Sequence, residues 1–148
     1  MSAKRPATLA RLAALEHFRE ERLRQQLATS HAAAEQARRR QASDESAWLA
    51  VEAARAATIA SAQADTGRYL LYALCADAAA ARLERSIETT AQAEAETERA
   101  AAAWAVGRAR REMTAERASR ARQEALREGE RKTAADLLDT WLGRERDA

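Results

Sequence analysis

Helix-interrupting residues are scarce in this chain. Its 148 residues include four glycines and one proline, and neither type occurs between Pro6 and Gly67. Chain reversals in globular folds depend heavily on these two residue types. The scarcity therefore excludes a fold of many short elements and predicts long, uninterrupted helices.

Large apolar side chains are scarce as well. The hydrophobic fraction is 47%, but 42 of those residues are alanines, which leaves 27 apolar residues larger than alanine. Each large aliphatic side chain contributes only ~1.5–3 kcal/mol when it is fully buried, so a compact layered domain would lack a sufficient core. Charged residues make up 32% of the chain. This composition, rich in helix formers, favours long helices or a coiled coil over a disordered chain.

Residues that carry chemistry are few. The two histidines, His17 and His31, lie ~21 Å apart along one helix, which is too far for both to bind one metal ion. The single cysteine, Cys75, cannot form an intramolecular disulfide, as is usual in a reducing compartment. It has no histidine nearby in the sequence, so we expect a small buried or interfacial thiol and not a nucleophile. The chain has no glycine-rich phosphate loop, and we expect no enzyme and no bound metal or cofactor.

Long apolar runs are absent too. No stretch approaches ~20 consecutive apolar residues, and the N-terminal "MSAKRPATLARLAALEHFREE" contains no apolar region typical of a secretory signal. The formal net charge of +2 is too balanced to indicate a nucleic-acid-binding protein. We therefore expect a soluble cytoplasmic protein that does not insert into a membrane.

The helix signals divide the chain in two. Pro6 and Thr8 suit a helix start, and "ADTGRY" combines a turn former, a possible N-cap and a glycine. The prediction is an all-α fold of a single domain, residues 1–148: a long antiparallel two-helix coiled-coil hairpin, shaped as an extended rod. Helix one is expected at about 7–65, the turn at 65–67, helix two at about 68–142 with Gly143 as its C-cap, and a charged tail at 143–148. A break near residues 43–46, in "QASDESAW", would give three helices instead.

A reversal at 66–67 sets the register of this hairpin. Facing residues should have numbers that add up to about 133, which places the arginine run 38–40 opposite Glu94, Glu96 and Glu98. The expected seam of helix two comprises Leu83, Ile87, Thr90, Glu94, Thr97, Ala101, Trp104, Arg108 and Arg111. Few of these side chains are large and apolar, so we expect marginal stability and fraying.

This register leaves the end of helix two without a partner. Residues from about 127 to 142, or ~24 Å of helix, have no counterpart on helix one. Within them, Leu137, Leu138, Trp141 and Leu142 form an apolar stripe. An unpaired stripe of this kind is typical of a protein-binding site, with a folded-back tail or self-association as the alternative.

A second apolar cluster follows the predicted turn. The stretch "TGRYLLYALCADA" gathers Tyr69, Leu70, Leu71, Tyr72 and Leu74 around the whole helix. One neighbouring helix cannot cover every face of such a segment. The sequence therefore predicts a second protein-binding site at the tip of the hairpin.

The segment "GRARREMTAERASRARQ" is strongly basic, with six arginines against two glutamates. In the expected register it lies level with Arg19, Arg22 and Arg24. Phosphate binding would follow from charge alone, but the segment lacks aromatic residues for base stacking and a DNA-binding motif. We expect a positive collar that meets an acidic protein surface, and no nucleic acid as a partner.

The chain resembles the central-stalk family of type III secretion systems, which includes the flagellar export protein FliJ and its injectisome counterparts of the YscO/SctO kind. The likeness covers nearly the whole chain in length and hairpin plan. In sequence it rests on "GRYLLYALCADAAAARLERSI" at the start of helix two and on "EGERKTAADLLDTW" near the end. The unusual alanine content and the short turn at 65–67 depart from the family pattern.

The resemblance implies a cytoplasmic stalk at the base of a membrane-embedded secretion apparatus, monomeric when alone. Its paired termini would enter the hexameric export ATPase, its tip would face the cytoplasmic domain of the export gate, and secretion chaperones could use the same surfaces. The residues implied at the ATPase end are Arg19, Arg22, Arg108, Arg111, Leu126, Leu137, Leu138 and Trp141. Those implied at the tip are Trp48, Leu49, Tyr69, Tyr72, Ala76, Ala79 and Leu83. The alternative is a coiled-coil scaffold that covers its apolar surfaces by self-association.

Overall fold

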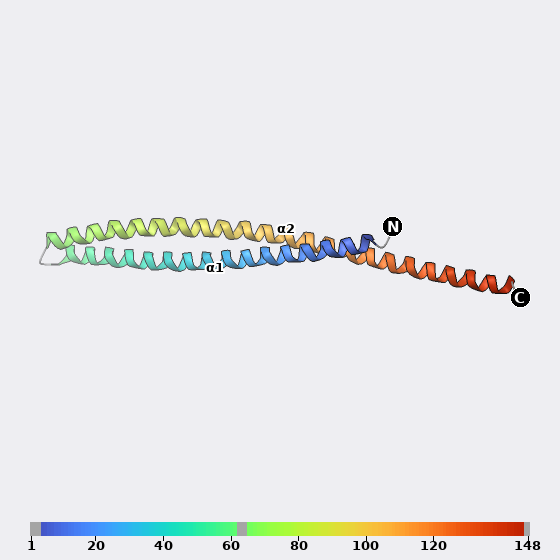
Figure 1. The fold of residues 1–148 in the computed structure, drawn as a ribbon. Coiled ribbons are helices and arrows are strands. Elements are labelled where there is room, and N and C mark those ends of the chain that lie inside the picture. The colour runs from blue at the N-terminus through green and yellow to red at the C-terminus, as the bar shows by residue number, and fades with distance from the viewer. Residues whose placement is uncertain (1–3, 62–64, 147–148) are drawn as a thin grey trace. The chain divides into compact units, whose positions relative to one another are not determined.

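The computed structural model describes residues 4–61 and 65–146. They form two helices, α1 (Lys4–Ala60) and α2 (Thr66–Arg146), and these two ranges contain no strand. The helices pack against each other in antiparallel order, since Arg38 pairs with Glu94 and the later Asp44 with the earlier Arg82 (Figure 1). The predicted all-α helical hairpin is confirmed.

Contacts divide the chain into two compact units. Unit 1 combines residues 1–24 with residues 103–148, and unit 2 consists of residues 25–102. In each unit a stretch of α1 lies beside a stretch of α2. Each unit is thus a pair of helical segments with its own contacts.

Asp65 caps α2. Its backbone carbonyl accepts a hydrogen bond from the Tyr69 amide at 3.0 Å, and its side-chain Oδ1 accepts one from the Arg68 amide at 3.1 Å. A side-chain acceptor at this position satisfies an amide that the first helical turn leaves unpaired. α1 ends at Ala60 and α2 begins at Thr66, so the connection lies earlier than the predicted turn at 65–67. Residues 62–64, which the prediction included in helix one, lie outside the described residues.

The glycines expected to end or reverse helices lie inside α2. Gly67 belongs to its first turn, and the helix continues past Gly143 to Arg146 instead of ending at residue 142. No glycine in the described ranges has a positive φ. Gly67, predicted in the turn, and Gly143, predicted as the C-cap, therefore do not adopt the left-handed conformation that favours glycine at such positions. Residues 147–148 of the predicted tail lie outside the described part of the chain.

α1 runs without a break across residues 43–46. The hydroxyl of Ser46 donates a hydrogen bond to the Ala42 carbonyl at 2.9 Å, which accommodates the serine inside the helix. Asp44, within this stretch, is buried and pairs with Arg82 of α2. The three-helix alternative does not apply.

In unit 2 a heptad series of covered residues runs along both helices. Buried or half-buried side chains recur at alternating spacings of three and four residues, as in a coiled coil. On α1 the series comprises Leu27, Ser30, Ala34, Ala37, Gln41, Asp44, Trp48, Val51, Arg55 and Thr58. On α2 it comprises Tyr69, Tyr72, Ala76, Ala79, Leu83, Ser86, Thr90, Ala93, Thr97 and Ala100. We call these residues, together with their equivalents in unit 1, the seam.

In unit 1 the same spacing holds over a shorter length. The α1 seam comprises Leu9, Ala13, Glu16, Glu20 and Leu23. The α2 seam comprises Trp104, Gly107, Thr114, Ala118, Ala121 and Ala125. Ala125 is the last half-buried residue of α2, so the pairing of unit 1 ends there.

The predicted seam of helix two is half correct. Leu83, Thr90, Thr97 and Trp104 belong to it. At the alternate positions the structure uses Ser86, Ala93, Ala100 and Gly107, each one residue before the predicted one. The prediction preferred larger side chains such as Ile87, but this side chain is exposed because the helices approach closely where only small residues fit.

The register is shifted by about one helical turn from the predicted one. Gly107 lies against Leu23, whereas the predicted register places it level with Gln26. The early end of α1 moves the connection toward the N-terminus and causes this shift. Arg38 still pairs with Glu94 at 2.8 Å, as predicted, because both side chains are long, whereas Arg39 pairs with Glu35 of its own helix.

Gly107 marks a close approach of the two helices in unit 1. A Cβ atom at this position would lie 2.5 Å from Cδ1 of Leu23, so the leucine occupies the space that a side chain would need. The buried residues among those described are all small or polar: Ala34, Ala37, Ala76, Gly107, Ala118, Glu20, Asp44, Ser86 and Thr90. Close contact of small side chains therefore replaces a core of large ones.

Two glycine substitutions test this close approach. Gly129→Ala should raise helical content, because alanine favours a helix by ~1 kcal/mol over glycine and no atom lies within 4 Å of the added Cβ. Gly107→Ala should raise the helical content less than Gly129→Ala does, or lower the melting temperature, because Leu23 must move to make room for the added Cβ. Circular dichroism with thermal melts measures both effects. Equal gains from the two variants would contradict the contact between Gly107 and Leu23.

Candidate protein-binding surfaces

A polar cluster joins the two helices of unit 1. Glu20 is only 4% exposed, and its Oε1 accepts a hydrogen bond from the indole Nε1 of Trp104 at 2.8 Å. Its Oε2 accepts a charge-assisted hydrogen bond from Arg111 at 3.4 Å. The guanidinium of Arg108 lies 5.8 Å from the Trp104 ring centroid, within the range of a cation–π contact. The buried carboxylate is thus matched by two donors from α2, which fixes how the two segments meet.

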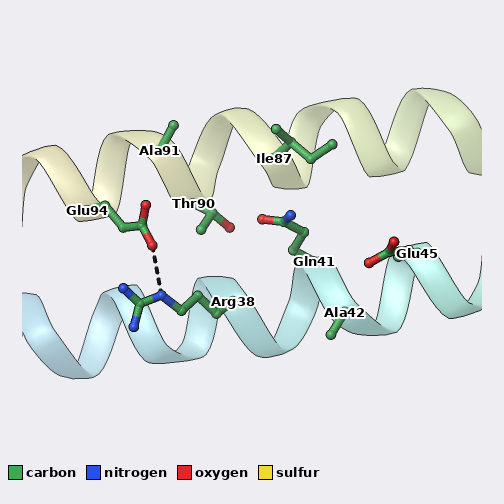
Figure 2. A pocket seen from close by; sticks show the side chains of 8 residues that line it. All are labelled: Arg38, Gln41, Ala42, Glu45, Ile87, Thr90, Ala91 and Glu94. Carbon is green, nitrogen blue, oxygen red and sulfur yellow. Dashed lines mark hydrogen bonds and ion pairs between the residues drawn. The ribbon is translucent and has the colours of Figure 1, made fainter.

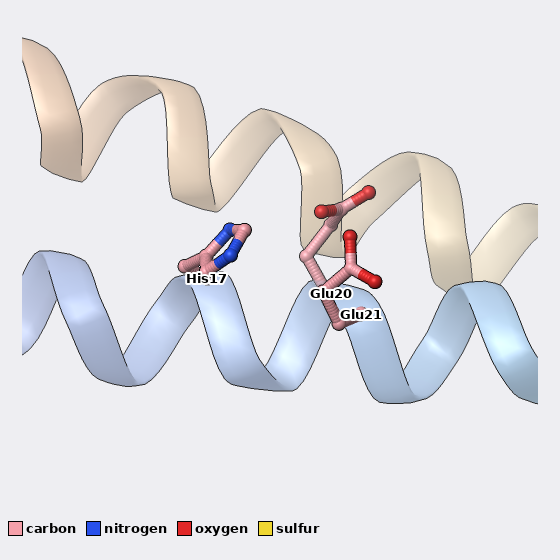
Figure 3. Close-up of side chains that lie close together, drawn as sticks. All are labelled: His17, Glu20 and Glu21. Carbon is pink, nitrogen blue, oxygen red and sulfur yellow. The ribbon is translucent and has the colours of Figure 1, made fainter.

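His17, Glu20 and Glu21 place three possible metal ligands close together on α1 (Figure 3). Their ligand atoms lie within 4.8 Å of one another, and the sequence argument missed them because it considered only the two histidines. Both carboxylates already face arginines: Arg111 at Glu20, and Arg24 at 3.7 Å from Glu21. A metal ion would compete with these guanidinium groups, so we assign the carboxylates to ion pairing.

The predicted positive collar is partly neutralised. Of the four arginines that the resemblance assigns to the ATPase end, three form ion pairs within unit 1: Arg111 with Glu20, Arg108 with Glu112 and Arg19 with Glu16. The fourth, Arg22, is exposed. The sequence suggested a more positive surface here, because it does not show which carboxylate forms an ion pair with each arginine.

The C-terminal part of α2 in unit 1 has no helix beside it. All described side chains of residues 126–144 are exposed, as expected for a segment beyond the end of the seam. Leu137, Leu138 and Trp141 line an open groove of about 610 Å³, which Ala134, Thr140 and Arg144 complete. The apolar stripe predicted from the sequence is therefore exposed on the helix surface.

The tip residues inferred from the resemblance are mostly seam residues of unit 2. Ala76 is 2% exposed, so it cannot contact a partner while the helices are paired. Trp48, Tyr69, Tyr72, Ala79 and Leu83 are half-buried in the same series, and Leu49 is exposed. Spacing alone shows that such residues share a face, but it does not show whether that face meets the other helix or solvent.

The outward side chains of this region are leucines that the inferred stripe left out. Leu70, Leu71 and Leu74 are all more than half exposed and lie one to three residues away from the stripe positions. Cys75 is exposed as well, so it is not a buried thiol, and its place at an interface stays a prediction. The outward apolar surface near the start of α2 is therefore this leucine cluster, and Leu49, Ile59 and Ile87 are further exposed apolar residues of unit 2.

A shallow groove lies between α1 and α2 in the middle of unit 2 (Figure 2). Its volume is about 400 Å³, and the ion pair between Arg38 and Glu94 spans it. Thr90 and the exposed Ile87 lie on the α2 side. The mixture of charged and small residues gives no concentrated apolar anchor, so this groove is a weaker candidate than the C-terminal stripe.

No segment of the two described helices is both long and apolar enough to cross a membrane.

Glu20→Ala should lower the free energy of unfolding of unit 1. The substitution leaves the Trp104 indole and Arg111 without their acceptor, and such losses cost ~1–3 kcal/mol. Glu21→Ala is the matched control, because Glu21 is half-buried and its ion pair with Arg24 is long at 3.7 Å. Urea unfolding followed by circular dichroism compares the two variants. Equal midpoints would show that the polar cluster does not hold the segments together.

Comparisons with known proteins give no assignment: no family model matches the chain, and no curated protein or solved structure is significantly similar to it.

Proposed function

We propose that the chain is a non-enzymatic central-stalk protein of a type III secretion export apparatus. In this role it binds the hexameric export ATPase and links it to the cytoplasmic domain of the export gate, and it acts at the cytoplasmic base of the apparatus. The same surfaces could receive secretion chaperones, and in an injectisome the protein would contribute to virulence.

The observation that carries the proposal is the unpaired C-terminal part of α2. A helix that extends beyond its partner and exposes Leu137, Leu138 and Trp141 is suited to insertion into another protein. The resemblance of "EGERKTAADLLDTW" to the C-terminal region of the stalk family assigns that protein as the ATPase. The leucine cluster of unit 2 supplies a separate apolar surface for the gate.

The seam suits a linking role that needs no chemistry. It contains mostly small or polar residues, so each unit is held by close contacts and a few ion pairs and not by a large core. Helices held in this way can present separate surfaces to different proteins without contributing catalytic groups. The arginines left exposed, such as Arg22, add attraction to an acidic partner.

A self-associating scaffold is the second candidate. Unit 1 exposes Leu12, Leu15 and Phe18 on α1 and Val106 and Met113 on α2. Copies of the same chain could cover these side chains, and the resulting protein would be at least a dimer. Mass in solution therefore separates the two candidates.

Size-exclusion chromatography with light scattering tests the stalk proposal directly. We expect a monomer that co-elutes with the export ATPase of the same secretion system. The double variant Leu138→Ala/Trp141→Ala should lose this co-elution, because it removes the exposed apolar anchors. A stable dimer that does not co-elute with the ATPase would support the self-associating scaffold instead.

The gate surface has its own test. Leu71→Ala and Leu74→Ala should weaken binding to the cytoplasmic domain of the gate, because they shorten the outward side chains of the leucine cluster. Binding to the ATPase should be unchanged, and calorimetry with each purified partner measures both. If Tyr72→Ala disrupts gate binding while the leucine variants do not, the partner reaches the seam and the assignment to outward leucines is wrong.

A further inference from the structure

The C-terminal stripe does not continue the face that pairs with α1. Helical residues advance by ~100° each, so the seam positions of α2 can be followed beyond Ala125. They fall near Glu128, Lys132, Ala135 and Asp139, which are mostly charged. Three residues of the stripe, Leu137, Leu138 and Trp141, lie on the opposite side of the helix, at least ~100° from Ala118, Ala121 and Ala125, whereas Leu142 lies at the edge of this side, ~60° from Ala121.

Charge is also divided between these two sides. Arg127, Arg131 and Arg144 fall on the side of the stripe, where the acidic residues are Glu130 and, at the end of α2, Glu145. Glu128, Asp136 and Asp139 fall on the other side with Lys132, which forms an ion pair with Glu128 at 3.0 Å. Within residues 127–144 the border of the stripe is therefore net basic, whereas the side that continues the seam is net acidic.

The basic border is available to a partner. Arg127, Arg131 and Arg144 are exposed on α2, and Lys132 on the other side pairs with Glu128. Exposed arginines beside an apolar surface favour a partner with carboxylates at matching positions. A second copy of this stripe would bring the same basic border, so like charges would oppose self-pairing.

The shape of the stripe favours a protruding side chain. Its residues enclose an open groove of about 610 Å³ with Trp141 and Leu137 among the lining residues. A concave apolar site accepts an aliphatic knob from a facing helix, as in coiled-coil packing.

We propose that the C-terminal stripe binds an amphipathic helix whose apolar knobs are flanked by Asp or Glu. This helix approaches α2 from the side opposite α1, so it binds without displacing α1. The inference rests on the proposed function only in taking the stripe as a protein-binding site, and it adds the chemistry of the partner and the direction of its approach.

Two neighbouring residues provide a matched pair of charge reversals. Arg131→Glu and Lys132→Glu change the net charge equally, but Arg131 borders the stripe and Lys132 lies on the far side. The probe is a labelled synthetic helical peptide with leucines at a and d positions and glutamates beside them, and the control peptide carries lysines instead. Fluorescence anisotropy with the full chain measures the dissociation constants at low and high salt.

The acidic peptide should bind wild type and the lysine peptide should not. Arg131→Glu should weaken binding at least about threefold, and Lys132→Glu should leave it within about twofold. The double variant Leu138→Ala/Trp141→Ala should abolish binding, and higher salt should reduce the effect of Arg131→Glu. Circular dichroism verifies that each variant remains helical.

Several outcomes would overturn the inference. They are equal weakening by both reversals, equal binding of the two peptides, or no binding of the acidic peptide. Binding to vesicles of anionic phospholipid that depends on Arg131, without peptide binding, would assign the stripe to a membrane surface. A dimer dispersed by Leu138→Glu would assign it to a second copy. If the export ATPase fails to bind wild type while the peptide results hold, the proposed function fails and this inference stands.

Discussion

Close contact between small side chains is the constraint on which each helical unit depends. Neither unit has a core of large residues, so its stability comes from bringing two backbones near enough for alanine, serine, threonine and glycine to touch. Leu23 against Gly107 is the clearest case. Large side chains would hold the helices apart at these positions, and they are therefore found mostly on outward faces, where other proteins can reach them.

The sequence predicted the class of fold because its strongest signals were absences. Because the chain has only one proline and four glycines, its sequence predicted long helices with one connection near Asp65. The seam was harder to predict, because a burial pattern formed by Ser86, Ala93 and Gly107 carries almost no hydrophobic contrast. Small residues that are buried look the same in sequence as small residues that are exposed, so the choice between Ser86 and Ile87 could not be made from side-chain character.

The candidate binding surfaces follow the same rule. The C-terminal stripe was predictable, because its leucines and tryptophan stand out from a charged background and no helix remains to cover them. At the other surface the sequence identified the apolar segment but not its outward face, because apolar residues occur on all sides of it. Ala76 proved to be buried, and Leu71 exposed. Only the direction of the neighbouring helix distinguishes the two, and that direction is a tertiary property.

The buried carboxylates have a consequence for alignment. Small residues recur at many seam positions, so apolar contact at these positions discriminates only weakly between alignments that differ by one heptad. Glu20 meets Trp104 and Arg111 in unit 1, and Asp44 meets Arg82 in unit 2. Such a shift would leave the buried carboxylate of Glu20 or Asp44 without its donors. The free-energy cost of an unpaired buried carboxylate exceeds the difference in apolar contact between the two alignments. Glu20 in unit 1 and Asp44 in unit 2 therefore favour one register of the two helices, the one in which each buried carboxylate has its partners.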